Sequence, residues 1–204
     1  MANITKVDYD AIPRQAMSMR NYGKEINTQL TTAYKSIEDM HQSWYGVRYN
    51  SLVKEFNKII PSLNELLELV VGELPYTLET VANNYALADR GTGVTKAAKE
   101  TAQKITNLPI LNDVGMKFVT SQVTTVQQGV VKNFQNAKDK MNLLEAEFAK
   151  ITWQSEAATA FRARFKKLKT EIVKAFDNLE VQFSKLMNET KEDIQKTESA
   201  NTVQ

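Results

Sequence analysis

Apolar residues along the first half of the chain recur at the spacing of two amphipathic helices. The first series alternates steps of four and three residues, the heptad spacing of a helix that packs along one face: Met19, Gly23, Ile26, Leu30, Ala33, Ile37, Met40 and Trp44. The second series has a mean step of about 3.67 residues, typical of a nearly straight helix: Leu52, Phe56, Ile59, Leu63, Leu67, Val70, Leu74, Leu78, Val81 and Tyr85. The pattern predicts a hairpin of two long helices.

The second half of the chain repeats this pattern. A further apolar series runs from Val119 to Ile151 and predicts a third helix. Adding 109 to each position of the second series gives ten positions of which nine are apolar: Phe161, Phe165, Leu168, Ile172, Phe176, Leu179, Phe183, Met187, Thr190 and Ile194. The same offset places Trp44 on Trp153. We interpret the chain as an internal duplication, with hairpins at 1–90 and 113–204.

Residues 91–112 form the predicted connection between the hairpins. Gly91 and Gly93 are typical helix stops. Within the connection, residues 96–105 are expected to form a short polar helix, and Asn112 or Asp113 is expected to cap the third long helix.

Two prolines fall inside the predicted second helix. Pro61 and Pro75 each remove a backbone hydrogen bond, so we expect kinks or a break at these positions. The apolar spacing continues through both prolines, which favours one bent helix over two unrelated ones.

A lone helical hairpin leaves an apolar stripe uncovered, and the second hairpin supplies the cover within the same chain. The sequence therefore predicts an all-α fold in which two hairpins pack antiparallel into an elongated four-helix bundle. Pairing within one chain also predicts a monomer near 23.1 kDa.

The composition narrows the chemistry that the chain can perform. With no cysteine and one histidine among 204 residues, disulfides, thiolate catalysis, most zinc sites and most histidine-based catalysis are excluded. The sequence has no glycine-rich phosphate loop and no nucleophile elbow. We therefore expect a protein that is not an enzyme and that uses no cofactor or metal.

Charge and hydropathy further limit the partners. The net charge of +2 gives no reason to expect nucleic acid binding, and the N-terminus lacks the apolar segment of a cleavable secretory signal peptide. Six cations crowd one predicted helix and leave contact with an anionic membrane open: Arg162, Arg164, Lys166, Lys167, Lys169 and Lys174.

Two short motifs stand at corresponding places in the predicted hairpins. Trp44-Tyr45-Gly46 marks the first turn, where glycine permits a sharp reversal and the indole closes the bundle end. Trp153-Gln154-Ser155 marks the second turn. Tyr85 and Asp89 place a phenol and a carboxylate on one helix face, and the positions offset by 109 are Ile194 and Glu198.

In these motifs the chain resembles the WXG family of type VII secretion substrates, early-secreted-antigen-like hairpins of Gram-positive bacteria, and looks like two of them fused. The resemblance is closer over residues 14–89 than over 113–198, where Ser155 and Ile194 depart from the motifs. It implies that Tyr85 and Asp89 form the export signal and that Trp44 and Gly46 form the matching turn, with Trp153 and Ser155 as the divergent second turn.

The resemblance also implies a cellular role. The signal would be read by the membrane ATPase of the secretion system, and the protein would be secreted or held at the cell surface as an effector, carrier or chaperone-like module. A secreted partner or a host protein would be a further binding partner. Two alternatives stay open, a membrane-active protein whose hairpins separate and an intracellular coiled-coil scaffold.

Antiparallel packing of the hairpins makes a geometric prediction. The turn of each hairpin should meet the helix ends of the other, so Trp153 is expected near Tyr85 and Asp89, and Trp44 near Ile194 and Glu198. The two tryptophans could equally serve only as core residues that plug the bundle ends.

Overall fold

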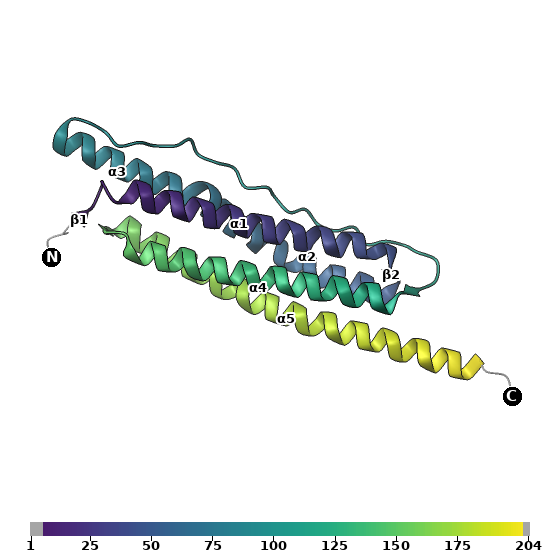
Figure 1. Cartoon of the computed structure of the whole chain (residues 1–204). Coiled ribbons are helices and arrows are strands. Elements are labelled where there is room, and N and C mark those ends of the chain that lie inside the picture. Colours follow the sequence, from purple (N-terminus) through teal and green to yellow (C-terminus); the bar gives the residue numbers. More distant parts are fainter. Residues whose placement is uncertain (1–5, 202–204) are drawn as a thin grey trace.

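The computed structural model describes residues 6–201 and consists of two long helical hairpins packed into an elongated bundle (Figure 1). The first hairpin comprises α1 (Ile12–Asp39) and a second rod built from α2 (Val47–Leu67), η2 (Glu68–Glu73) and α3 (Leu74–Arg90). The second comprises α4 (Thr120–Lys150) and α5 (Glu156–Asn201). The predicted all-α, four-helix architecture is confirmed.

The predicted apolar seams form the core. All eight residues of the first series, from Met19 to Trp44, are buried, and α1 lies antiparallel to α4 along this seam. The second rod lies antiparallel to α5, and Phe134 of α4 stacks on Phe176 of α5 with ring centroids 4.3 Å apart. Burial of long apolar side chains from both hairpins in one core is what joins the hairpins.

The second rod is bent, as its prolines predict, and the bend contains a π-helical segment. Pro61 lies inside α2, and Pro75 is the second residue of α3, which directly follows η2. The Leu74 N–H bonds the Leu69 carbonyl five residues back, which is the π pattern. The wider turn shifts the helix phase, so Ala86 is buried whereas Tyr85 is 40% exposed. The expectation that Tyr85 continues the apolar seam is therefore wrong.

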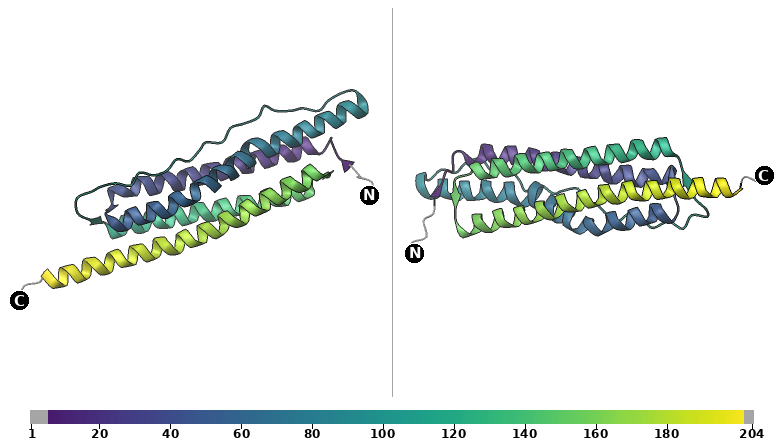
Figure 2. Two further views of the ribbon diagram at one scale, coloured as in Figure 1. Left: turned by 180° about the vertical axis from the view of Figure 1, so that it is seen from behind. Right: turned by 90° about the horizontal axis from the view of Figure 1, so that it is seen from below.

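Two short antiparallel strand pairs close the ends of the bundle. β1 (Lys6–Val7), just before α1, pairs with β4 (Trp153–Gln154) in the turn of the second hairpin. β3 (Lys117–Phe118), just before α4, pairs with β2 (Trp44–Tyr45) in the turn of the first. Each hairpin thus donates the segment before its first helix to the turn of the other (Figure 2).

The connection between α3 and β3 runs the length of the bundle without helical structure (Figure 1). The expected helix over residues 96–105 is wrong, because these residues bond to side chains of the first hairpin instead of to one another. The expected caps are also wrong. The cap position of α4 is Val119, and Asp113 instead bonds His41 of η1 (Met40–Gln42) at 2.9 Å.

No helix within residues 6–201 combines the length and the apolar character that crossing a bilayer requires.

Tyr49 makes the stability of the core dependent on alkaline pH. Its hydroxyl donates to the Ile37 carbonyl at 3.1 Å, and burial, followed by the charges of Glu38, Asp113 and Asp39, raises its pKa from 10.0 to about 12. The unfolded chain therefore loses this proton first. The contribution is fully present below pH 10, and we expect it to fall by up to about 3 kcal/mol as the pH rises from 10 to 12.

Urea unfolding of the Tyr49→Phe protein at successive pH values checks this dependence. The variant should lose about 1 kcal/mol at neutral pH, through the missing hydrogen bond, and should show a shallower decline between pH 10 and 12. Tyr45→Phe, a change at a half-buried tyrosine, serves as the control with a wild-type profile. An unchanged decline in Tyr49→Phe would show that other groups cause it.

Candidate functional site

The first turn, Trp44-Tyr45-Gly46, has the geometry that its residues predict. Gly46 adopts a φ of 116°, which L-amino acids with a side chain rarely adopt, and it precedes the first residue of α2. Trp44 is 1% exposed, lies edge-on to Phe118 at 5.5 Å and stacks on Phe183 at 6.0 Å. The Trp44 indole is therefore a core residue that joins both hairpins and is closed to direct contact by a partner.

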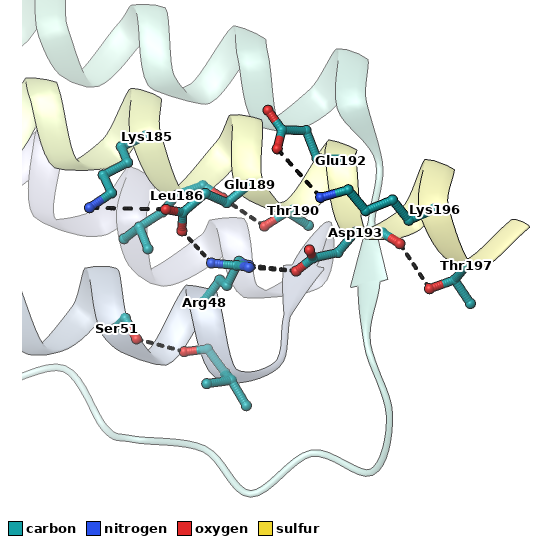
Figure 3. A network of polar contacts seen from close by, with 11 residues as sticks. Arg48, Ser51, Lys185, Leu186, Glu189, Thr190, Glu192, Asp193, Lys196 and Thr197 are labelled. Atoms are coloured by element: carbon teal, nitrogen blue, oxygen red, sulfur yellow. Dashed lines mark hydrogen bonds and ion pairs between the residues drawn. The ribbon is translucent and has the colours of Figure 1, made fainter. Parts of the chain in front are cut away.

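The C-terminal part of α5 lies against this first turn. Figure 3 shows Arg48 of α2 between Glu189 and Asp193 of α5, with its Nε donating to Asp193 Oδ2 at 3.0 Å. A cavity of about 190 Å³ opens here between Gly46, Met116 and Thr190. The residues that follow the turn thus contact α5 as far as Asp193, the residue before Ile194. The Trp44 ring itself stacks on Phe183, eleven residues before Ile194, so the expected contact of Trp44 with Ile194 and Glu198 is not found within residues 6–201.

The second turn, Trp153-Gln154-Ser155, reaches a similar reversal by another means. Trp153 is 3% exposed and packs on Phe161 with ring centroids 6.2 Å apart. Ser155 does not copy the backbone of Gly46, since within residues 6–201 only glycines have positive φ. Its Oγ accepts the Ala158 N–H at 3.1 Å and so caps α5. The serine is explained by helix capping.

The end of α3 carries the two residues of the tail motif on its surface. Tyr85 is 40% exposed, and no hydrogen bond to its hydroxyl is found within residues 6–201. Asp89, one helical turn later, is also exposed and accepts a short hydrogen bond from the Tyr9 hydroxyl, which raises the pKa of Tyr9. An exposed phenol and carboxylate one turn apart offer a partner both an apolar contact and a charged acceptor.

Residues just before α1 connect this surface to the second turn. Val7 pairs with Trp153, and the Asp8 N–H donates to the Thr152 carbonyl at 3.0 Å. The next residue, Tyr9, bonds Asp89. One three-residue segment therefore contacts both the second turn and the tail motif, so both lie at the same end of the bundle, as antiparallel packing predicts.

A second contact holds this end. The Arg90 guanidinium pairs with Asp10 at 3.0 Å and lies over the Tyr9 ring, 5.2 Å from its centroid. Sequence reasoning missed Tyr9 and Asp10, because they precede the first apolar series and carry no periodic signal. We call the surface formed by Tyr9, Tyr85, Asp89 and Arg90 the α3-end surface.

Part of the basic cluster on α5 is committed to contacts within the protein. Arg162 donates to the Trp153 and Ile151 carbonyls, each at 3.2 Å. Arg164 pairs with Glu73 at 2.6 Å and with Glu65 at 3.2 Å. Lys169 pairs with Glu145 of α4, whereas Lys166, Lys167 and Lys174 are exposed. The cluster thus contributes to helix packing.

Within residues 6–201, no group of three or more histidine, aspartate and glutamate side chains is arranged to hold a metal ion. Comparison of the chain with protein-family models, with curated proteins and with solved structures finds no match.

Proposed function

We propose that this protein is a non-enzymatic substrate of a type VII secretion system, released as a single-chain pseudo-dimer. The α3-end surface is the export signal in this proposal, with Tyr85 and Asp89 as its recognition residues and the secretion ATPase as its reader. After export the protein acts as an effector, carrier or chaperone-like module.

One observation carries the proposal. The exposed side chains of Tyr85 and Asp89 lie at the same end of the bundle as the turn of the other hairpin, and residues 7–9 contact both that turn and Asp89. In the family that the sequence resembles, the signal combines the turn of one hairpin with the tail of its partner. In this proposal one polypeptide supplies both parts.

The two tryptophans have a supporting role in this proposal. Trp44 and Trp153 are 1% and 3% exposed, so they shape the turns from within. Recognition then depends on the exposed phenol of Tyr85 and on the Asp89 carboxylate.

Export from a competent strain tests the proposal. Each of Tyr85→Ala and Asp89→Ala is expected to lower the extracellular fraction about tenfold or more at an unchanged cellular level, because about 1.4 kcal/mol of lost binding energy is tenfold in affinity. Both side chains are exposed, so the helical circular dichroism should stay at the wild-type value. The measurement is an immunoblot of culture medium and lysate.

The matched control is Leu87→Ala. Leu87 is 47% exposed on the same helix, between the two signal residues but off their shared face. Its export should equal that of the wild-type protein. Unimpaired release of both signal variants would contradict the signal assignment, and wild-type protein found only in the lysate would favour an intracellular scaffold.

A further inference from the structure

The connection between the hairpins is held along the first hairpin like a bound peptide. Its residues 97–111, which we call the strap, run extended over the groove between α1 and α2. The side chains turned into the groove recur at every third residue, the period of an extended polyproline-type chain: Ala102, Ile105, Leu108 and Leu111. The first three are 6%, 3% and 2% exposed.

Four asparagines of the first hairpin bind the backbone of the strap. Each uses its amide nitrogen to donate to a strap carbonyl and its amide oxygen to accept the N–H of the same residue, at 2.7–3.2 Å. The pairs are Asn27 with Gln103, Asn64 with Ile105, Asn57 with Leu108 and Asn50 with Leu111. The strap therefore receives the kind of backbone pairing that a neighbouring β-strand would give.

The spacing of these contacts is matched between helix and strap. On α2 the asparagines are seven residues apart, about 10.5 Å along the helix, and their strap partners are three residues apart, about 9–10 Å of extended chain. On α1 the same ratio holds, since Asn27 bonds Gln103 and, seven residues on, the Tyr34 hydroxyl bonds Thr106 at 3.2 Å. Two helices thus present a regular register for an extended segment.

The groove selects a peptide segment by its backbone N–H groups and by the size of its side chains. The side chain of each asparagine hydrogen-bonds peptide groups of the strap, so it accepts any residue with an N–H at the paired position. The strap obeys this limit, because Pro109 falls between the paired residues Leu108 and Leu111. The buried positions add a second requirement, an apolar side chain at every third residue.

We propose that the groove between α1 and α2 is a binding site for an extended peptide segment of a partner protein, with an apolar residue at every third position. In the structure the protein's own strap occupies this site, and the partner segment binds in place of the strap. The strap is the resident ligand. Because the strap is attached to the protein at both ends, its effective concentration at the groove is high. A partner peptide can therefore bind the groove only when the contacts between the strap and the groove are weakened.

Binding of a peptide in trans tests this proposal on the full-length chain. The Ile105→Ser/Leu108→Ser variant weakens the strap and leaves every groove residue unchanged. A fluorescein-labelled peptide with the sequence of residues 99–113 is expected to bind this variant saturably in fluorescence anisotropy. Wild-type protein should bind the same peptide at least tenfold more weakly, because its own strap competes. Circular dichroism confirms that the variant is helical, and Leu108→Ser alone replaces it if the double variant does not fold.

Two matched comparisons separate backbone recognition from non-specific adhesion. N-methylation of the peptide at Leu108 removes the N–H that Asn57 accepts and should lower affinity at least tenfold, whereas N-methylation at the exposed Ile110, between the paired positions, should change it less than twofold. Adding Asn57→Leu to the strap variant should also lower affinity at least tenfold. Failure of a folded strap variant to bind the peptide, or equal binding of both N-methylated peptides, would overturn the proposal.

Discussion

Glu79→Ala is expected to lower the free energy of unfolding by about 3–5 kcal/mol, because it removes the closer ion-pair partner of the buried Arg20 charge and leaves only Glu100, whose Oε1 lies 3.4 Å from Arg20 Nη1. The side chains of Arg20 and Glu79 are 7% and 6% exposed, and Arg20 Nη2 lies 2.9 Å from Glu79 Oε1. Glu79 Oε2 also accepts the Ala97 N–H at 2.9 Å, so the substitution frees the start of the strap as well. Urea unfolding followed by circular dichroism measures the loss.

Two controls identify burial as the cause. Glu55→Ala breaks an exposed pair with Lys58 and should cost less than about 1 kcal/mol. Replacing the buried pair together, as Arg20→Met/Glu79→Leu, should restore part of the stability, because two apolar side chains need no compensating charge, whereas the Ala97 N–H still lacks its Glu79 acceptor. A Glu79→Ala protein as stable as the wild type would show that water reaches the pair in solution.

The sequence was sufficient to predict the bundle because its information is local and periodic. Every position of the heptad series from Met19 to Trp44 is buried. A seam of this kind specifies which helix face is covered, and the paired hairpins then have few ways to cover both seams. The reversal at Gly46 is also local, since its φ of 116° is a property of the turn itself.

The strap could not be predicted in the same way, because its structure depends on residues distant in sequence. Residues 96–104 have good helix propensity, and on that basis a short helix was the natural expectation. Asparagines on α1 and α2 satisfy the strap backbone instead, across separations of 41–76 residues. The seven-residue spacing of Asn50, Asn57 and Asn64 was a visible signal, but a polar face of that period is ordinary on an exposed helix.

The candidate site, too, could be predicted only in the part that depends on local sequence. The sequence identified Tyr85 and Asp89 by their spacing, yet the π-helical segment before α3 determines that Tyr85 faces outward. One extra residue in a helical turn changes the phase of all that follows, and apolar periodicity alone does not locate it. Tyr9 is held at the site because β1, just before it, pairs with the second turn. A strand of two residues is too short to produce a recognisable pattern of alternating apolar residues.

Trp44→Ala is expected to cost about 3–5 kcal/mol, since it removes a large side chain that contacts both hairpins. Trp44 packs on Phe183 of α5, on Phe118 of β3 and on Tyr49 of α2. Trp44→Phe should cost less, because a ring remains in contact with Phe183. Urea unfolding measures both variants. If Trp44→Ala lowered the free energy of unfolding by less than about 1 kcal/mol, the indole would not be a core residue in solution and would be accessible to a secretion partner. The expected loss instead means that any export defect of this variant reports the fold, so the signal must be tested at Tyr85 and Asp89.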